Sequence, residues 1–410
     1  MSWIDHSVWW HVYPLGFTGA FPQRDEPGRG LRHLIAWLGY ARDLGANGLA
    51  LGPIFRSMAH GYDTLDHCQI DPRLGTLDDF DALVTACHEK GLRLLLDGVF
   101  NHVGRDHPLF QRALSEGPDG EYAHFFALDW RSGQPQTRVF EGHGNLVEFN
   151  HANPAVACYV HDVMDFWLGR GADGWRLDAA YSVPASFWAS VVPGVRELHP
   201  DAWFVGEVIH GDYARFVTDG KLDSVTEYEL WKAIWSALAS RNFFELDWTL
   251  RRHNDFLATF TPLTFVGNHD VTRIATSAGL DKTVLALAIL MTVGGIPSIY
   301  YGDEQGFQAV KEDRRGGDDA VRPAFPATPE GLAPDGQWVY RAHQDLIGLR
   351  RRHPWLVRAR VEKRELTTTH FVYTARADGE GELTVDLTLE AAPGVTIKDA
   401  GGATLYHWSA

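Results

Sequence analysis

The sequence has few cysteines, a deficit of positive charge and no stretch at its N-terminus that fits a signal peptide. Its 410 residues include 3 cysteines, Cys68, Cys87 and Cys158, which lie far apart and form no CxxC pair. This spacing argues against a disulfide framework and indicates thiols in a reducing compartment, so we predict a cytoplasmic protein. The 37 basic residues are outnumbered by 53 acidic ones, and the net charge of −16 disfavours nucleic acids and membrane surfaces as partners.

Membrane-spanning runs are also scarce. The longest stretch without a charged residue that we tested, 283–301, is interrupted by Gly294, Gly295 and Pro297. A helix-sized piece followed by a strand-sized piece is therefore expected, both buried in a protein core. With 45% hydrophobic and 22% charged residues, the composition is that of a globular protein.

Short apolar runs alternate with amphipathic stretches along most of the chain. Because these runs are nearly continuous in apolar residues, they indicate parallel strands that are covered on both faces. Between them, Thr76 with Asp79 forms a helix-start signal, and Asn153 with Pro154 forms another. Eight such strands alternating with helices predict a (β/α)8 TIM barrel, and no GxGxxG motif supports a dinucleotide-binding fold instead. We place the strands at 9–13, 48–54, 92–97, 174–178, 203–207, 223–228, 263–266 and 298–301.

Two regions break the alternation. Residues 101–150 are rich in Gly, Pro, His and Asp and have weak periodicity, which indicates an excursion after the third strand. After His353 the apolar residues recur with period two, as in an antiparallel sheet. We therefore predict a barrel over 1–100 and 151–352, a short excursion domain over 101–150 and a small C-terminal β domain over 353–410.

Acidic residues stand at the predicted carboxyl ends of four strands, where barrel enzymes keep their active sites. They are Asp97, Asp178, Glu207 and Asp270. Arg176 precedes Asp178 by two positions, so both side chains should point to the same side of the strand. A neighbouring cation should lower the pKa of Asp178 and keep it ionised, as a nucleophile requires, whereas an acid in a drier setting could donate a proton.

Four segments resemble the signature segments of glycoside hydrolase family 13, the α-amylase family, and they occur in that family's order. They are DGVFNH at 97–102, GWRLD at 174–178, VGE at 205–207 and FVGNHD at 265–270. Further matches are HGYDT at 60–64, IDP at 70–72 with GT at 75–76, and YYGDE at 300–304. The resemblance extends over about residues 8–350 and supports the predicted barrel.

The resemblance implies roles for the acids. Asp178 would be the nucleophile, Glu207 the general acid and then base, and Asp270 the stabiliser of the distorted sugar in the transition state. Arg176 would orient Asp178. The implied mechanism is retaining, which requires the nucleophile and the acid to lie ~5–5.5 Å apart.

The resemblance also implies substrate-binding residues. His102 and His269 would hydrogen-bond the sugar at the cleavage site, Tyr62 would stack on that sugar, and Asp97 would support the acids from the third strand. Asn268, which precedes His269, belongs to the same group.

Two further segments resemble the cyclomaltodextrinase and neopullulanase branch of the family. NLVEFN at 145–150 lies where the family has a fifth segment, although Val147 replaces the usual proline, and GGDDAVRPAF at 316–325 resembles that branch's donor-side loop. The resemblance implies that Arg322, with either Asp318 or Asp319, grips a sugar there. The chain is expected to lack the branch's N-terminal β domain, and its oligomeric state stays open.

A metal site is not expected. Asn101 matches the position that holds calcium in many α-amylases, but the sequence after Asp178 has no histidine to complete such a site. We therefore predict no cofactor, with Asn101 as the ligand if calcium were bound. The 20 histidines include no HExxH motif for zinc, and His11 stands alone on the first strand.

The resemblance implies an enzyme, a glycoside hydrolase that cleaves α-glucosidic bonds in malto-oligosaccharides, cyclodextrins or related α-glucans. Two alternatives stay open. One is a transglycosylase with the same active site, which passes the glycosyl group to a sugar instead of water. The other is a non-catalytic relative that serves as a binding subunit, which the presence of all the acids argues against. Bond type and chain length are not fixed by the sequence.

Overall fold

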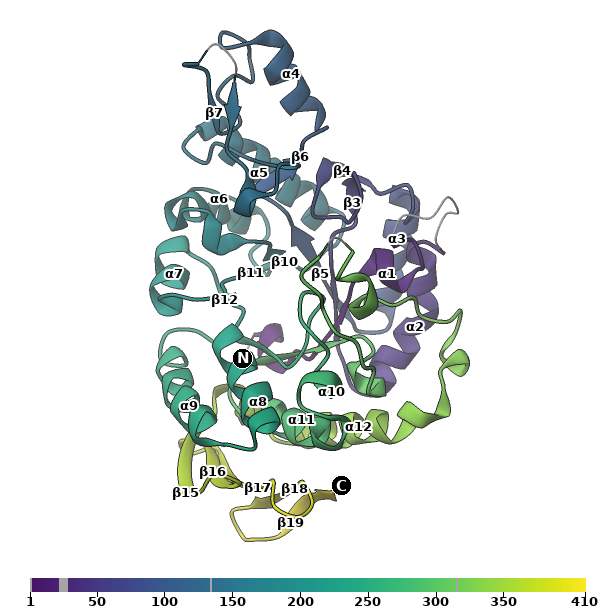
Figure 1. Ribbon diagram of the computed structural model, residues 1–410, viewed down its shortest axis with the longest axis vertical. Helices are drawn as coiled ribbons and strands as arrows, with labels where there is room; N and C mark the ends of the chain where they lie inside the picture. Colours follow the sequence, from purple (N-terminus) through teal and green to yellow (C-terminus); the bar gives the residue numbers. More distant parts are fainter. Residues whose placement is uncertain (1, 22–28, 133–134, 315) are drawn as a thin grey trace.

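The structure, a computed structural model, describes residues 2–21, 29–132, 135–314 and 316–410 (Figure 1). In these residues the largest sheet has eight strands, all paired in parallel, in the order β12-β11-β10-β5-β2-β1-β14-β13. A parallel bridge between Thr226 and Leu263 joins its two edges, so the sheet closes into the predicted barrel. The strands are β1 (Trp9–Val12), β2 (Gly48–Leu51), β5 (Arg93–Gly98), β10 (Gly174–Leu177), β11 (Trp203–Gly206), β12 (Ser224–Val225), β13 (Leu263–Phe265) and β14 (Ile296–Tyr300).

Helices surround the barrel. The N-terminus of α3 confirms one expected start, because the Thr76 hydroxyl accepts from the Asp79 N–H and the Asp79 carboxylate accepts from the Thr76 N–H. The α-helices of the barrel are α1 (Pro14–Phe17), α2 (Leu31–Leu44), α3 (Leu77–Glu89), α5 (Pro154–Gly169), α6 (Ala185–Leu198), α7 (Tyr213–Gly220), α8 (Tyr228–Ser240), α9 (Phe244–Phe256), α10 (Ile274–Ser277), α11 (Thr283–Thr292) and α12 (Gln337–Arg352). Short 3-10 turns lie at Trp3–His6, Phe140–Gly142, Ala180–Ser182, Leu280–Lys282, Asp303–Gln305, Asp319–Val321, Pro329–Gly331, Pro334–Gly336 and Pro354–Arg358.

The sixth predicted strand, 223–228, is shorter than expected. The strand β12 comprises only Ser224 and Val225, Thr226 adds the single bridge to Leu263, and Tyr228 begins α8 instead. The residue after Thr226, Glu227, forms a buried contact with His253 of α9, in which Oε2 of Glu227 lies 2.8 Å from Nδ1 of His253. This contact across the fold overrides the local strand pattern.

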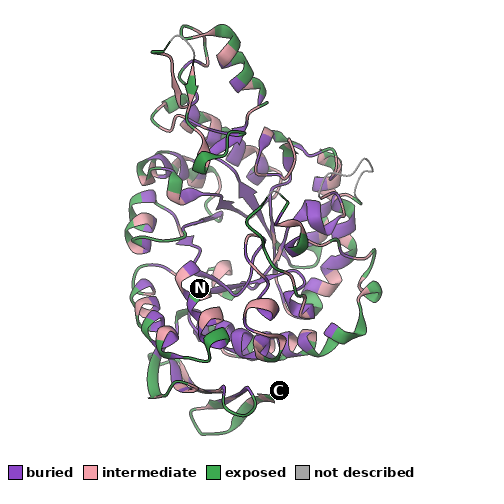
Figure 2. Ribbon diagram, in the orientation of Figure 1, coloured by how far each residue is buried: buried purple, intermediate pink, exposed green. Residues whose placement is uncertain are grey.

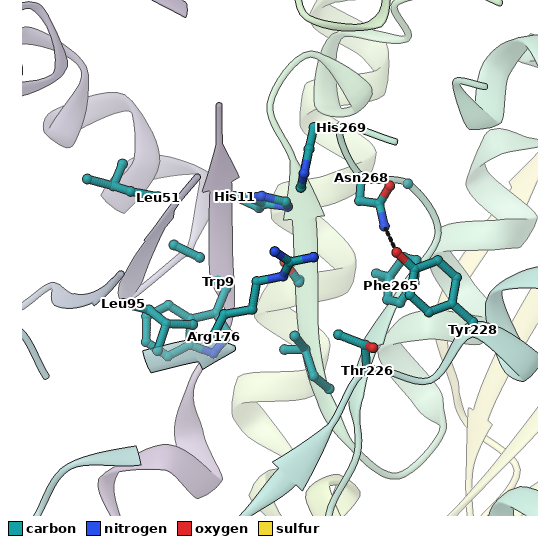
Figure 3. A pocket seen from close by; sticks show the side chains of 14 residues that line it. Trp9, His11, Leu51, Leu95, Arg176, Thr226, Tyr228, Phe265, Asn268 and His269 are labelled. Atoms are coloured by element: carbon teal, nitrogen blue, oxygen red, sulfur yellow. Dashed lines mark hydrogen bonds between the residues drawn. The ribbon is translucent and has the colours of Figure 1, made fainter. Parts of the chain in front are cut away.

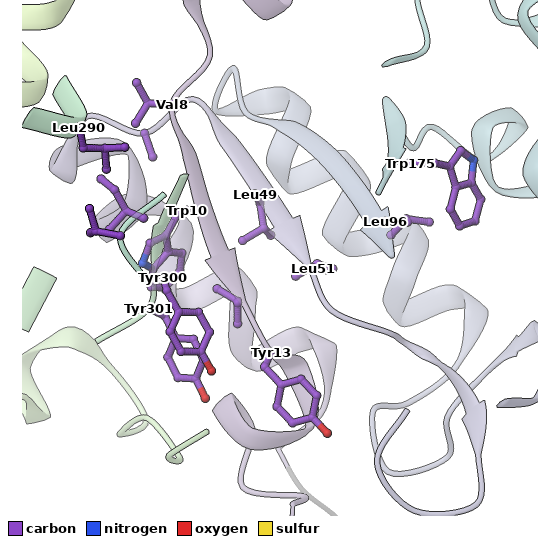
Figure 4. Close-up of a cluster of buried hydrophobic side chains, with 14 of the residues drawn as sticks. Val8, Trp10, Tyr13, Leu49, Leu51, Leu96, Trp175, Leu290, Tyr300 and Tyr301 are labelled. Atoms are coloured by element: carbon purple, nitrogen blue, oxygen red, sulfur yellow. The ribbon is translucent and has the colours of Figure 1, made fainter. Parts of the chain in front are cut away.

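Strand alternation divides the apolar side chains into an outer and an inner layer. The outer layer packs between strands and helices and includes Trp10, Leu49, Leu96 and Trp175 (Figure 4). The inner layer fills the barrel near the amino ends of the strands, where Trp9 stacks on Trp203 at 5.8 Å. Leu95, Val205, Leu263, Ile296 and Val357 complete this inner plug. Figure 2 shows the barrel strands as buried.

The apolar stretch 283–301 forms a buried helix and a buried strand, as expected. Every residue of α11 is buried, and so is every residue of β14. The guanidinium of Arg350 donates to the carbonyls of Met291 and Val293 at the end of α11, which satisfies groups that the helix leaves unpaired. Among the described residues, we find no helix with the length and apolar character needed to cross a membrane.

Two smaller units extend from the barrel, at opposite ends of the view in Figure 1. Between β5 and α5 the chain forms β6 (His102–Gly104), α4 (Pro108–Glu116), β7 (Leu128–Asp129), β8 (Gln136–Thr137) and β9 (Leu146–Glu148). A hairpin-like pair, β3 (Phe55–Ser57) and β4 (Thr64–Ile70), lies nearby. After α12, five antiparallel strands form a sheet in chain order: β15 (Arg360–Leu366), β16 (His370–Ala377), β17 (Gly381–Thr388), β18 (Gly394–Asp399) and β19 (Thr404–Ser409). The domain boundaries given above stay predictions.

Candidate active site

One guanidinium joins three acids from three adjacent strands. Arg176 lies opposite Asp97 in the β10–β5 register, and its Nη1 is 2.7 Å from both carboxylate oxygens of Asp97. The same Nη1 lies 3.1 Å from Oδ1 of Asp178, and Nη2 lies 2.6 Å from Oε1 of Glu207. Asp178 and Glu207 follow neighbouring strands β10 and β11, so the fold brings the predicted nucleophile and acid to one buried cation.

The backbone after Asp178 also binds Glu207. Ala179 has φ 45° and ψ 34°, a left-handed conformation that is uncommon for a residue with a side chain. This turn aims the Ala179 N–H at Oε2 of Glu207, at 2.9 Å. A strained residue between the two acids fits a site in which the surrounding structure fixes their relative position.

Tyr228 is a site residue that the sequence analysis did not identify. Its hydroxyl donates to Oε1 of Glu207 at 2.9 Å, and it accepts from the side-chain amide of Asn268 at 2.9 Å (Figure 3). The predicted strand over 223–228 placed Tyr228 in the sheet, and none of the family segments contains it. Only the folded structure identifies Tyr228, because the start of α8 lies next to Glu207 in space although the two residues are 21 positions apart in the sequence.

Asp270 follows β13 and contacts the side chains of Arg322 and His269. Its Oδ1 is 2.8 Å from Nη2 of Arg322, and its Oδ2 is 3.0 Å from Nε2 of His269. Arg322 Nη2 also lies 3.3 Å from Oδ2 of Asp318. Of the two candidates for a partner of Arg322, Asp318 is therefore in contact, whereas Oδ1 of Asp319 has no hydrogen-bond partner among the described residues.

Tyr62 and the two histidines form a layer next to the acids. The Tyr62 hydroxyl donates to Oδ2 of Asp97 at 3.0 Å and lies in very close contact with Nε2 of His269. The rings of Tyr62 and His269 are nearly parallel, with centroids 5.2 Å apart. His102 donates from Nε2 to the Tyr62 carbonyl at 3.0 Å, and Phe140 of the excursion stacks on its ring at 4.6 Å. The excursion thus contacts the site.

Asn101 lies one residue before His102 and bonds to it. Its amide nitrogen is 3.1 Å from Nδ1 of His102, in a buried setting. Within the described ranges, no group of three or more His, Cys, Asp or Glu side chains is arranged to hold a metal ion. Asn101 therefore contacts a histidine of the candidate site, and no step of the chemistry is assigned to a metal.

Electrostatics differ from the expectation for Asp178. Burial raises the pKa of Asp178 well above its usual value. Arg176 acts to lower it, as expected, whereas the negative charges of Glu207, Asp97 and Asp270 raise it further. The expectation of a low pKa was wrong because burial, together with the charges of the other acids, outweighs the arginine. Burial raises the pKa of Asp97 as well, although the positive charge of Arg176 acts to lower it. For Asp270, burial also acts upward, but His269, Arg322 and Arg176 together hold its pKa well below the usual value.

A cavity of about 40 Å³ lies inside the barrel and is lined by Arg176 and by Trp9, Leu95 and Leu263 of the inner plug (Figure 3). Polar side chains line its upper part, and Trp9, Leu95 and Phe265 are among the apolar ones. Arg176, which contacts the acids, thus borders a mostly apolar cavity. The lining consists of Trp9, His11, Ala50, Leu51, Leu95, Arg176, Thr226, Tyr228, Leu263, Phe265, Gly267, Asn268, His269 and Ser298.

Comparisons with known proteins identify relatives of this chain. A family model described as "Alpha amylase, catalytic domain" matches residues 11–358. A cyclomaltodextrinase from Geobacillus thermopakistaniensis is 32% identical over 414 residues, covering 92% of this chain and 68% of its own length. Neopullulanase 2 from Thermoactinomyces vulgaris is 31% identical over 390 residues, covering 88% of this chain and 65% of its own. The chain thus spans about two thirds of the length of these relatives.

A solved structure of similar length shares the whole fold. The ligand-free cyclic α-maltosyl-(1→6)-maltose hydrolase from Arthrobacter globiformis has a TM-score of 0.84 to this chain, and the match covers 100% of both chains. Its sequence identity is 24%.

Proposed function

The chain belongs to the α-amylase family of glycoside hydrolases, and from this premise we propose that it hydrolyses α-glucosidic bonds with retention of anomeric configuration. The observation that carries the proposal is the Arg176 guanidinium, which holds Asp178 and Glu207 together at the ends of β10 and β11. Cyclodextrins, malto-oligosaccharides and related α-glucans are the proposed substrates. The names of the relatives, cyclomaltodextrinase and neopullulanase, support that class.

In the first step Glu207 donates its proton to the glycosidic oxygen while an Asp178 oxygen attacks the anomeric carbon. The bond between that carbon and the glycosidic oxygen breaks, a bond to Asp178 forms, and the leaving sugar departs as a neutral alcohol. Such a mechanism needs the two carboxyl groups ~5–5.5 Å apart, which leaves no room for a water between them. Their shared contact with one guanidinium supports this arrangement.

In the second step Glu207, now a carboxylate, takes a proton from water. The resulting hydroxide attacks the anomeric carbon from the side that the first sugar left, and Asp178 is released. Two inversions at the same carbon give net retention. Asp178 leaves as a carboxylate beside Arg176, which stabilises the charge that it regains.

The remaining site residues bind and orient the sugar in this proposal. Asp270, held as a carboxylate by His269 and Arg322, would stabilise the distorted ring in the transition state. His102 and His269 would bond the sugar hydroxyls, and Tyr62 would stack on the ring. Asp97 supports the cluster through Arg176, and Arg322 with Asp318 would hold the next sugar on the donor side.

We further propose a cytoplasmic location and the three-part organisation given above. All three cysteines, Cys68, Cys87 and Cys158, are free in the described chain, as expected in a reducing compartment. The excursion between β5 and α5 and the sheet after α12 support boundaries near residues 100, 150 and 352.

Product analysis tests the function. Chromatography of the products from maltotriose, pullulan and β-cyclodextrin should show shorter sugars, and NMR should show the α-anomer as the first product. Products longer than the substrate would indicate a transglycosylase instead. A first product in the β-configuration would exclude retention, and no cleavage of any α-glucan would refute the proposed function.

A further inference from the structure

A hydrogen-bond chain with a fixed direction runs from Asp270 to Glu207. The backbone N–H of Asp270 donates to Oδ1 of Asn268 at 2.9 Å, which fixes the orientation of that side-chain amide. The amide nitrogen of Asn268 must then donate to the Tyr228 oxygen, also at 2.9 Å (Figure 3). The hydroxyl proton of Tyr228 is therefore free for Oε1 of Glu207, at 2.9 Å.

The members of this chain are shielded from solvent and held in place. Tyr228, Asn268 and Glu207 are each at most 8% exposed, so bulk water does not replace one partner by another. The Tyr228 ring packs edge-on against Phe265 at 4.9 Å. The preceding residue, Glu227, is locked by its buried ion pair with His253. Burial and the charge of Glu207 raise the pKa of Tyr228, so its hydroxyl keeps the proton that it donates.

The two oxygens of Glu207 are bonded unequally. Oε1 contacts both the Tyr228 hydroxyl and Nη2 of Arg176, the latter at 2.6 Å, whereas Oε2 accepts one bond, from the Ala179 N–H at 2.9 Å. Each carboxylate oxygen offers about two acceptor sites, so a proton on Oε1 would displace one of its two donors, whereas Oε2 keeps one site open for the proton. The charged and titratable groups that face this carboxyl and Tyr228 are Arg176, Asp97, Asp178, Asp270 and Tyr181.

We propose that Tyr228 is a positioning residue that reserves Oε1 of Glu207 as an acceptor, so that the proton of the reaction is carried on Oε2. Asn268 sets the direction of the Tyr228 hydroxyl. This inference rests on the proposed role of Glu207 as acid and base. Because a donor to the charged form favours that form, Tyr228 also assists the second step, in which Glu207 must be a carboxylate.

The pH dependence of kcat/KM on maltotriose tests the proposal. In Tyr228→Phe the carboxylate loses one donor, so the alkaline limb of the profile should move to higher pH by about one unit or more, as expected for loss of a hydrogen bond to a charged group. In Asn268→Asp the new carboxylate would accept the Tyr228 proton, and the limb should move in the same direction.

Tyr213→Phe is a matched control. Tyr213 is a buried tyrosine whose hydroxyl donates to the Ile209 carbonyl at 2.9 Å, so this variant removes a hydroxyl without touching a carboxylate. Its alkaline limb should coincide with that of the wild type. A limb that stays in place or moves down in Tyr228→Phe, or moves equally in the control, overturns the proposal.

A neutron structure of the deuterated protein separates this inference from the proposed function, because it needs no turnover. The deuterium on the Tyr228 oxygen should point to Oε1 of Glu207, with the Asn268 amide nitrogen facing the Tyr228 oxygen. A deuterium that points to Asn268, or an amide in the reverse orientation, overturns the hydrogen-bond chain even if the protein is an active hydrolase. If the protein cleaves no α-glucan, the proposed function fails while the neutron map still tests the chain.

Discussion

Replacing Arg176 by methionine should destabilise the protein in a pH-dependent way. The arginine faces side chains of Asp97, Asp178 and Glu207 that are 0%, 10% and 8% exposed. Methionine fills similar volume but leaves these carboxyl groups without their cation. Removal of one partner of a buried ion pair costs about 3–5 kcal/mol of folding free energy, so we expect a loss in that range at pH 8.

The sign of the pH effect follows from proton binding. Without Arg176, the pKa values of Asp97 and Asp178, already raised by burial, should rise further above those of the unfolded chain. The folded variant then binds more protons than the unfolded chain at pH values above ~4, so its stability should fall as pH rises through this window. The destabilisation relative to wild type should therefore be smaller at pH 5 than at pH 8.

Urea unfolding at pH 5 and pH 8 measures both quantities. The control is Arg215→Met, because Arg215 pairs with Asp219 at 3.2 Å with side chains 77% and 52% exposed, and exposed pairs contribute only about 0–1 kcal/mol. If Arg176→Met loses no more than this control, or loses more at pH 5 than at pH 8, the reasoning about a shared buried cation is wrong.

Three further variants test individual residues. Asp178→Asn should reduce turnover of maltotriose by at least ~10³-fold with little change in melting temperature, and near-normal activity would rule out the nucleophile role. Glu207→Gln should impair substrates with poor leaving groups far more than activated aryl α-glucosides, because only the former need a proton, and equal losses in kcat/KM on both would contradict the acid role. Thr76→Ala removes the cap of α3 and should cost about 1 kcal/mol in a urea titration with activity retained, so an unchanged midpoint would show that the cap is not needed.

Local patterns in the sequence were sufficient to predict the barrel. Apolar runs and helix-start signals depend on residues close together in the chain, and these placed the eight strands and the start of α3. The resemblance of short segments to the α-amylase family located the acids at the strand ends. The contacts that hold these acids come from residues far apart in sequence.

Three features of the site depend on such distant contacts. Tyr228 was predicted to end a strand because nothing nearby shows that its hydroxyl meets Glu207, which precedes it by 21 residues. The pKa of Asp178 was predicted with the wrong sign because only the adjacent arginine was considered, and not the burial of the carboxyl group or the other acids near it. Asp318 and Asp319 are neighbours in sequence, and only the turn that follows decides which of them reaches Arg322.

Stacked tryptophans fill the barrel at the amino ends of its strands, below the candidate active site. Among the described residues, Trp9 and Trp203 pack with the other side chains of the inner plug, so in the proposed mechanism water should reach the sugar bound to Asp178 from the carboxyl ends of the strands. In that mechanism, the water or sugar that accepts the glycosyl group would enter by the route through which the first product leaves. A first product that dissociates slowly would delay the entry of water and could itself accept the glycosyl group. The balance between hydrolysis and transglycosylation should therefore depend on the rate at which the first product is released.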